Sequence, residues 1–487
     1  MLPNTTIGLN LAGLHDILVR QLPDPERRAL VQTLFYKRLS LLAHEFYGGK
    51  LQTAPRCGLY GPAWLNVWYT PGVSAVSTAI RDNNDQSFSL SARGSTVAIV
   101  SDSTRVLGDG DCTPPGGLGV MEGKAFLMKY LGGVDAVPLC VNSRGPDGRP
   151  DPARLIDFVR MASPSFGAIN LEDISQPNCF RVLDELRDSC GIAVWHDDAQ
   201  GTACVTLAGL LNALQLADKR LGDVSIVLLG AGAANTTIAR LLLADGADPA
   251  RLCLFDKHGG LHAGRLDLEA DPLAGRQWQL AQQTNPGRFQ TPAEALRGAD
   301  VLVALSQSGP GVVKAEWVAS MAPQAIVFAC ANPVPEIWPH QAKAAGAFIV
   351  ATGRGDFPNQ VNNSVCFPGI LKGVLLVRAK AISDSMAIRC AHSLADFATR
   401  RGITPDAIMP TMEDDGVFAR QAADVAEQAA QEGLARLVLT PAEVYERATA
   451  DIRAARQLFT DLMDNGLIQA PPESMLQAAL DWALAQV

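Results

Sequence analysis

Apolar residues recur at helical spacing in the first 55 residues of the chain. The segments "LAGLHDILVRQL" and "PERRALVQTLFYKRLSLLAHEF" place apolar side chains three and four positions apart, as on one face of an α-helix. Pro25 heads the second segment, and proline is well tolerated in the first turn of a helix. We therefore predict helices in residues 1–55.

From about residue 90 the pattern changes to short apolar runs that alternate with helical segments. "FGAINLED" (166–173) and "GIAVWHDD" (191–198) are typical of buried strands, and the segment between them has helical spacing. Strand, helix and strand form the crossover unit of a parallel sheet, whose strands end at one edge. We therefore expect the acids that end the two strands to lie close together: Glu172, Asp173, Asp197 and Asp198.

A second alternating block begins near residue 224. "DVSIVLLGAGAANTTIARLLLADG" is typical of a strand, a glycine turn and a helix, and four further strands are predicted in "RLCLFDKHG", "ADVLVALS", "QAIVFACANP" and "AFIVATG". Beyond about residue 380 the chain is alanine-rich and helical. The pattern predicts an α/β fold: an N-terminal α/β domain with a parallel crossover unit, a Rossmann-type domain and C-terminal helices.

The composition is that of a soluble globular protein. Of 487 residues, 48% are hydrophobic and 19% charged, and this length allows two or three domains. The net charge of −9 and the isoelectric point near 5.4 argue against a nucleic-acid partner. The chain has no apolar run of membrane-spanning length, and its start lacks a signal-peptide pattern, so we expect no membrane partner.

The ten cysteines are spread along the chain without a CxxC pair or any clustering. In a chain of this length that spacing is typical of reduced core thiols, and a disulfide framework or a zinc site is not expected. We therefore predict a cytoplasmic protein.

The turn "GAGAAN" (230–235) predicts a dinucleotide site, with Gly230, Ala231, Gly232 and Ala233 lining it. Asp256 ends the next strand, 24 residues after Gly232, where its carboxylate could accept from a ribose 2′-OH. The alternative is a glycine turn in a nucleotide-free α/β domain. Asn235 stands where a third glycine or an alanine is usual, so we expect looser packing between helix and strand there.

Uncompensated carboxylates at the end of a buried strand are costly, so the four acids need cations or strong donors. Three hard oxygen ligands, with room for water and a substrate oxygen, suit Mg²⁺ or Mn²⁺. The alternative is that these acids cap helices or form salt bridges.

Other candidates are individually weak. Lys124 in "MEGKAF" could equally be a solvated lysine, and Tyr69 in "WYTPGV" a packing residue. Arg105 in "STRVLG" is a candidate carboxylate clamp. The amides of "PNQVNN" (358–363) could hold a carboxylate or a nicotinamide, although turn-forming asparagines are the commoner explanation.

Taken in order, these pieces resemble the motifs of the malic enzyme family. The resemblance covers about residues 45–440 and rests on "YTPGV", "MEGKA", "INLEDIS", "HDDAQGT", "GAGAAN", "ANPVPEI" and "GRGDFPNQVNNSVCFPG". With the pattern above it implies four segments: N-terminal helices (1–55), a catalytic domain with metal and substrate sites (56–205), a Rossmann-type NAD(P) domain (206–378) and helices that pack back on the catalytic domain (379–487).

The resemblance also implies roles for the candidate residues. Lys124 would be the general base for the C2 hydroxyl of malate, with Asp197 as its electrostatic partner, and Tyr69 would protonate C3 after decarboxylation. The metal ligands would be Glu172, Asp173 and Asp198. The residues that would hold malate carboxylates or the nicotinamide end of the cofactor are Arg105, Asn332, Asn362 and Asn363.

The implied reaction is the oxidative decarboxylation of malate to pyruvate and CO₂, with reduction of NAD or NADP by a homodimer or higher homo-oligomer. The loop "GDGDCTPPGGLG" (108–119) departs from the family and leaves room for a related 2-hydroxy diacid. "DKHGG" places Lys257 and His258 beside Asp256; those cations would favour a 2′-phosphate and Asp256 would disfavour it, and we lean towards NAD. The alternatives are a malolactic-type reaction that yields lactate and a non-catalytic ligand-sensing protein.

Overall fold

The computed structural model describes residues 6–106 and 108–487. The chain forms two compact units, one of Met1–Arg56 with Arg456–Val487 and the other of Cys57–Ala455. We describe each unit by itself.

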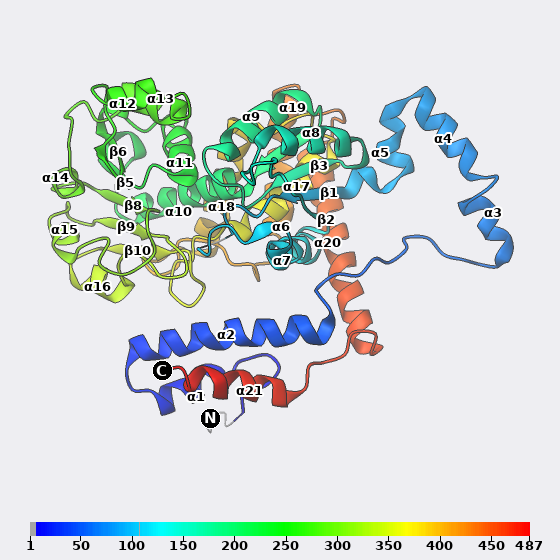
Figure 1. The fold of residues 1–487 in the computed structure, drawn as a ribbon, viewed down its shortest axis with the longest axis horizontal. Coiled ribbons are helices and arrows are strands. Elements are labelled where there is room, and N and C mark those ends of the chain that lie inside the picture. Colours follow the sequence, from blue (N-terminus) through cyan, green and yellow to red (C-terminus); the bar gives the residue numbers. More distant parts are fainter. Residues whose placement is uncertain (1–5, 107) are drawn as a thin grey trace. The chain divides into compact units, whose positions relative to one another are not determined.

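The first unit is helical, and it includes α1 (Leu14–Gln21), α2 (Pro25–Tyr47) and α21 (Glu473–Leu484) (Figure 1). Asp24 begins α2 by accepting from the backbone N–H of Glu26, and Pro25 occupies the first turn, as predicted. Helix α21 packs along α2 and shares an apolar core with α1 and α2. This core joins α1 and α2 to α21, which lies more than 400 residues later in the sequence.

A four-stranded parallel sheet, in the order β2-β1-β3-β4, lies in the second unit. Its strands are β1 (Thr96–Ser101), β2 (Asp135–Cys140), β3 (Ala168–Leu171) and β4 (Ala193–His196). Strands β3 and β4 pair in parallel, with α9 (Asn178–Ser189) between them in sequence, which confirms the predicted crossover unit. Strand β2 was not predicted, because the proline in "DAVPLC" interrupts its apolar run. A proline is tolerated there because β2 is an edge strand.

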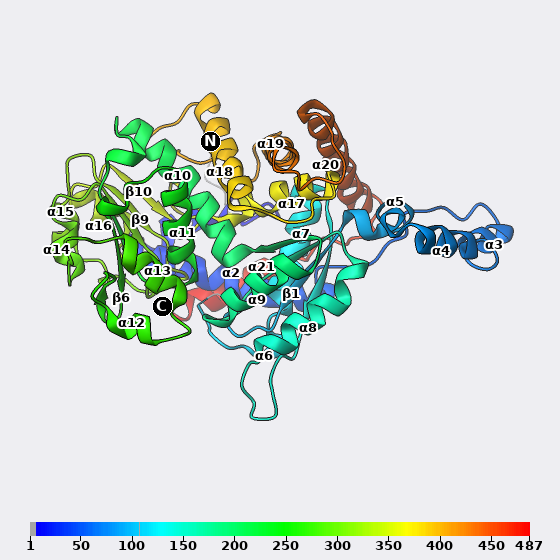
Figure 2. The same cartoon turned by 90° about the horizontal axis from the view of Figure 1, so that it is seen from above.

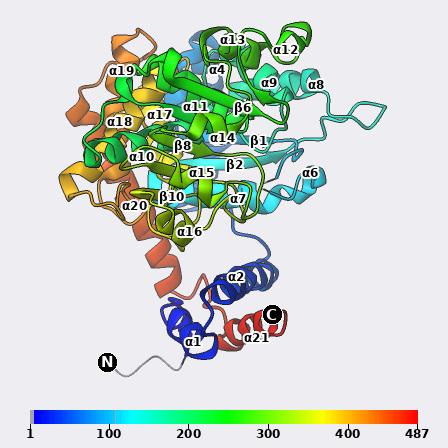
Figure 3. The same cartoon turned by 90° about the vertical axis from the view of Figure 1, so that its left-hand side faces the viewer.

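Helices cover both faces of this sheet, with α8 (Pro152–Ala162) and α9 on one face and α7 (Leu118–Gly132) on the other (Figures 1 and 3). Successive β1 side chains alternate between the faces: Ala98 and Val100 pack with α8 and α9, whereas Val97 and Ile99 pack with α7. The continuous apolar run of β1 is therefore explained by burial on both sides.

The second sheet has six strands in the order β10-β9-β8-β5-β6-β7. They are β5 (Ile226–Leu229), β6 (Leu252–Asp256), β7 (Gly259–Gly260), β8 (Val301–Ala304), β9 (Ile326–Ala329) and β10 (Ile349–Thr352). All but the short antiparallel β7 are parallel and were predicted from their apolar runs. The glycine turn leads from β5 into α11 (Ala233–Ala244), which gives the predicted Rossmann-type order of elements.

Helices α10 (Thr202–Leu216), α17 (Phe367–Leu376), α18 (Asp384–Arg401) and α19 (Val417–Gln431) contribute to one buried apolar cluster with side chains of both sheets. The two sheets of the second unit therefore share a continuous core. The bounds of the other helices are α3 Leu65–Trp68, α4 Val73–Asp82, α5 Ser87–Leu90, α6 Thr113–Gly116, α12 Leu266–Ala270, α13 Gly275–Gln283, α14 Pro292–Leu296, α15 Ala315–Ala319, α16 Pro339–Ala344 and α20 Pro441–Asp464.

The α/β class predicted from the sequence is confirmed, and the four segment bounds stay a prediction. The structure adds that residues 456–487 join residues 1–56 in one unit. Within the described parts of the chain, no helix combines the length and apolar character needed to cross a bilayer.

The packing of α17 on α19 depends on a residue without a side chain. A Cβ added to Gly373 would lie 2.6 Å from the carbonyl oxygen of Ala422, so the backbones meet there closely. Overpacking of this kind forces the helices apart.

We expect Gly373→Ala to lower the free energy of unfolding by about 1–3 kcal/mol, because the clash outweighs a helix-propensity gain of about 1 kcal/mol. The matched control is Gly275→Ala at the start of α13, where an added Cβ has no atom within 4 Å. Denaturant unfolding measures both variants. Equal stabilities would show that α17 and α19 can separate without cost.

Candidate active site

Carboxylates converge at the edge where β3 and β4 end. Leu171 pairs with His196 in the last register position, so the acids that follow each strand begin side by side. Carboxylate oxygens of Glu172, Asp173 and Asp198 lie within 4.8 Å of one another. The convergence expected from the crossover pattern is therefore present.

The backbone around these acids is unusual. Asp173 has a φ of 54°, in the left-handed region, and its N–H donates to Asp198 Oδ2 over 2.8 Å. Residues Asp197–Gly201 form a short π-helical turn, a feature that is frequent at functional sites. A side chain on Gly201 would collide with the Asp197 carboxylate and would lie 3.2 Å from Cβ of Asn363. The absence of a side chain at Gly201 thus lets the turn pack against both groups.

Lys124 reaches this edge from α7. Its Nζ forms ion pairs with Asp197 and, over 3.0 Å, with Oε1 of Glu172. Trp195 Nε1 donates to Asp197 Oδ1 over 2.9 Å, and Asn170 Nδ2 donates to Glu172 Oε2 over 2.9 Å. Each carboxylate that pairs with Lys124 is therefore also held by a hydrogen bond from a second side chain.

The cluster has more negative than positive charge. Burial lowers the pKa of Lys124, but the carboxylates of Asp197 and Glu172 raise it by more, so the pKa stands above its usual value and the lysine is charged. Burial raises the pKa of Glu172 and of Asp197, although Lys124 opposes this. Asp198 is 39% exposed, which leaves the cluster open on one side.

The donor set fits a divalent cation. Hard carboxylate oxygens are the ligands that Mg²⁺ and Mn²⁺ prefer, and one ammonium group cannot balance four carboxylates. Glu172, Asp173 and Asp198 could hold such an ion, while Asp197 faces Lys124. These roles stay predictions.

The glycine turn has the shape required for close approach of a ligand. Gly230 has a φ of 100°, and a Cβ there would lie 2.5 Å from the carbonyl oxygen of Leu305. Asn235 is fully buried, and its Nδ2 donates to the carbonyl oxygens of Leu229 and Gly230 over 2.9 and 2.8 Å. The looser packing expected at Asn235 is wrong, because its amide closes the turn with hydrogen bonds.

The other predicted residues of this turn are Ala231, Gly232 and Ala233, all half-buried at the start of α11. A Cβ on Gly232 would lie 3.6 Å from Oε1 of Gln176, in the loop after β3. The glycine turn and the acid cluster therefore border neighbouring loops of the same unit.

Asp256 ends β6, as expected, and Arg265 holds it in a two-bond ion pair that the sequence did not reveal. The bonds are Nη1 to Oδ1 over 3.1 Å and Nη2 to Oδ2 over 2.8 Å, and Arg265 also binds Asp267. The side chains of Lys257 and His258 point into solvent. Arg265 comes nine positions later in a loop, where no periodic pattern marks it.

Asn332 and Arg105 lie in two loops that the segment after β1 connects to the carboxylate cluster. A Cβ on Gly108 would lie 2.8 Å from the carbonyl oxygen of Asn332, so the loop after β1 touches the turn after β9. Arg105 is exposed, and its backbone N–H donates to the carbonyl oxygen of Asp173 over 3.0 Å. The buried Glu336, which the sequence did not single out, accepts from two backbone N–H groups of this region.

The side-chain amides of Asn362 and Asn363 differ in their surroundings. Asn362 Oδ1 accepts from the N–H of Ser364 over 2.9 Å, the turn-forming role that was the alternative explanation. Asn363 packs beside Gly201 and so borders the aspartate turn.

Tyr69 lies outside the carboxylate cluster. It ends α3 and is 71% exposed, in an arm of residues 57–86 without a buried residue. Helices α3 and α4 of this arm project away from the four-stranded sheet (Figures 1 and 2).

Comparisons with known proteins agree with the motifs. Family models for the malic enzyme N-terminal domain and the malic enzyme NAD-binding domain match residues 61–187 and 199–431. The chain is 41% identical over 391 residues to an NAD-dependent malic enzyme of Geobacillus stearothermophilus, covering 80% of this chain and 78% of that protein. It is 38% identical over 409 residues to a bifunctional malic/malolactic enzyme of Bacillus subtilis (strain 168), covering 84% and 96%. The crystal structure of Entamoeba histolytica malic enzyme superposes with a TM-score of 0.97, at 55% identity over 99% of each chain.

The two adjacent aspartates give a matched test of the predicted metal site. We expect Asp198→Asn to weaken Mn²⁺ binding by about tenfold or more, because it removes the charge of a predicted ligand. Asp197→Asn should keep the affinity within a few-fold, since Asp197 pairs with Lys124. Titration of Mn²⁺ followed by electron paramagnetic resonance measures both, and equal losses would refute the division of roles.

Proposed function

This chain belongs to the malic enzyme family, and from that premise we propose that it oxidatively decarboxylates malate, or a close 2-hydroxy diacid, to pyruvate and CO₂. We further propose that it reduces NAD and requires Mg²⁺ or Mn²⁺. The observation that carries the proposal is Lys124, held by Asp197 and Glu172 beside three converging carboxylates.

Glu172, Asp173 and Asp198 would hold the divalent cation. When bound, it supplies Lewis acidity that favours loss of the C2 hydroxyl proton and stabilises the negative charge left as CO₂ departs. Arg105 and the amides of Asn332, Asn362 and Asn363 would orient the substrate carboxylates and the nicotinamide end of the cofactor.

Lys124 would accept the C2 hydroxyl proton as hydride leaves C2 for the nicotinamide. A base must first be uncharged, and in this cluster the acids keep Lys124 charged. Neutralising Glu172 and Asp198 by a bound cation removes part of the negative field that holds the proton. Asp197, fixed by Trp195, would keep Nζ aimed at the substrate.

Tyr69 would protonate C3, and we propose that a second copy of the chain supplies it. In its own chain Tyr69 sits on an exposed arm, whose large side chains have little cover. They are Leu59, Tyr60, Trp64, Leu65, Val67, Trp68 and Tyr69. An apolar patch of this kind is typical of an interface, and an arm exchanged in a symmetric dimer would bury it. This supports a homodimer whose sites each combine residues of two chains.

We propose NAD as the cofactor because of Asp256. Arg265 orients its carboxylate and is itself occupied by two acids, so a 2′-phosphate would meet negative charge. The acidic chain and its ten free cysteines support a cytoplasmic location without a nucleic-acid partner.

The first test crosses malate and related 2-hydroxy diacids with NAD and NADP in the presence of Mn²⁺. We expect pyruvate and reduced cofactor in equal amounts, with malate and NAD the best pair, and no turnover after removal of the metal. The alternative is a malolactic reaction, in which lactate forms without net reduced cofactor, because the Bacillus subtilis relative is named a bifunctional malic/malolactic enzyme. That result, or binding without turnover, would overturn the proposal.

The second test combines two inactive variants, Lys124→Ala and Tyr69→Phe, by coexpression. If each site takes Tyr69 from the partner, half of the random dimers have one intact site, and about a quarter of wild-type activity returns. Recovery cannot occur if Tyr69 serves the site of its own chain. Each variant expressed alone is the control.

The third test removes the carboxylate at the proposed ribose subsite. We expect Asp256→Ala to raise the ratio of kcat/KM for NADP over NAD by about tenfold or more, because Arg265 is freed for the 2′-phosphate. Asp256→Ala with Arg265→Ala should lose that gain, and Lys257→Ala should leave the ratio near wild type. An unchanged ratio in Asp256→Ala would contradict the assignment.

A further inference from the structure

We propose that Cys204, Cys366 and Cys390 form a second metal site, which takes one soft cation of the Zn²⁺ class. Their Sγ atoms lie within 4.8 Å of one another. This site is separate from the carboxylates at the strand ends, and the proposal does not depend on the function proposed above.

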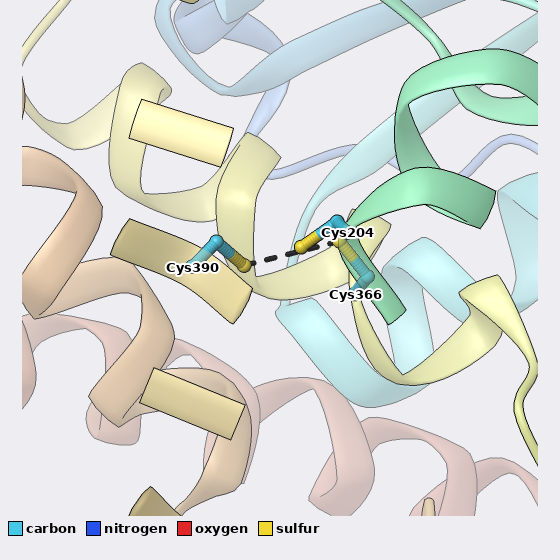
Figure 4. A group of neighbouring side chains, drawn as sticks. All are labelled: Cys204, Cys366 and Cys390. Carbon is cyan, nitrogen blue, oxygen red and sulfur yellow. Dashed lines mark hydrogen bonds between the residues drawn. The ribbon is translucent and has the colours of Figure 1, made fainter. Parts of the chain in front are cut away.

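Three helices bring the thiols together. Cys204 lies in the first turn of α10, Cys366 caps the start of α17, and Cys390 lies within α18. All three side chains are fully buried, and Figure 4 shows the thiols turned toward one another. The cysteines are 162 and 24 positions apart in sequence, which is why the spacing of the chain predicted isolated core thiols and no zinc site.

The sulfur spacing fits metal ligation. Zinc–thiolate bonds of about 2.3 Å in a tetrahedron place neighbouring sulfurs about 3.8 Å apart. The Sγ atoms of Cys366 and Cys390 are 3.8 Å apart, far beyond the roughly 2.05 Å of a disulfide bond. Cys204 needs a shift of at most about 1 Å to complete the same geometry.

An oxygen atom beside the thiols could serve as fourth ligand. Gln421 is fully buried, and its Oε1 lies 3.6 Å from Sγ of Cys390. Its Nε2 donates to the carbonyl oxygen of Val365 over 2.7 Å, which fixes the amide with its oxygen toward the sulfurs. Three sulfurs and one amide oxygen would form a closed, four-coordinate site.

The protons and charge of the site can be accounted for. Cysteines bind such a cation as thiolates, so binding would release three protons to solvent and leave the three thiolates and the divalent cation with one net negative charge. Cys204 lies in the first turn of α10 and Cys366 caps the start of α17, and the N-terminal ends of both helices favour negative charge.

The position of the site indicates a structural role. Helix α10 starts directly after the Asp197–Gly201 turn, and Phe367, next to Cys366, has its ring 4.5 Å from Nζ of Lys124. A cation bound to the three thiols would therefore link α10, α17 and α18 next to the Asp197–Gly201 turn.

Cobalt titration of the full-length, chelator-treated and reduced protein tests the proposal. We expect one equivalent of Co²⁺ to give an intense thiolate-to-metal charge-transfer band, which carboxylate ligands cannot produce. Cys390→Ser should lose the band, and Cys253→Ser, a buried cysteine outside the cluster, should keep it. Glu172→Gln should keep the band as well, because Glu172 belongs to the carboxylate cluster and not to the thiol site. The band therefore tests the thiol site independently of the proposed catalytic function.

Absence of the band from reduced wild-type protein overturns the site, as does a band that survives in Cys390→Ser. If that variant does not fold, Cys204→Ala and Cys366→Ser provide the same comparison. Zinc analysis of the protein as purified is an independent readout: about one zinc per chain supports the site. A Cys366–Cys390 disulfide in its place would overturn it.

Discussion

The burial of one lysine among carboxylates is the interaction on which the rest of the site depends. Lys124 lies in α7, and its partners Glu172 and Asp197 directly follow β3 and β4. A buried ion pair is stable only if its remaining hydrogen bonds are made and its geometry is fixed. The parallel order of the strands, with α7 packed on one face, supplies that geometry.

This constraint explains several local features that are otherwise costly. Asp173 has a left-handed backbone, and the residues after His196 form a π-helical turn instead of a regular first turn of α10. A residue larger than glycine would not fit at position 201, because the Asp197 carboxylate and Asn363 occupy the space of its side chain. Strain of this kind persists where the surrounding packing fixes it, and it is frequent at functional sites.

Much of the fold could be predicted because its central strands are buried on both faces and are therefore continuous apolar runs. The edge strand β2, which contains Pro138, and the two-residue β7 lack that signal. The convergence of Glu172 with Asp198 followed from the crossover rule, which concerns neighbouring strands.

Contacts between distant segments could not be predicted in the same way. Arg265 reaches Asp256 from a loop, and Asn235 closes the glycine turn with a side-chain amide that the motif does not require. The three clustered cysteines meet only because α10, α17 and α18 pack together. The exposed position of Tyr69 depends on how the arm leaves the sheet, which no periodicity describes.

The most direct measurement of the central claim is malate turnover by Lys124→Ala, with Mn²⁺ and NADH binding measured on the same preparation. Removal of a general base costs about 10²–10⁴-fold in rate, while the proposed metal and cofactor residues stay in place. The account therefore predicts a loss of that size in kcat, with both ligands bound at near wild-type affinity. Turnover within a few-fold of wild type would contradict it.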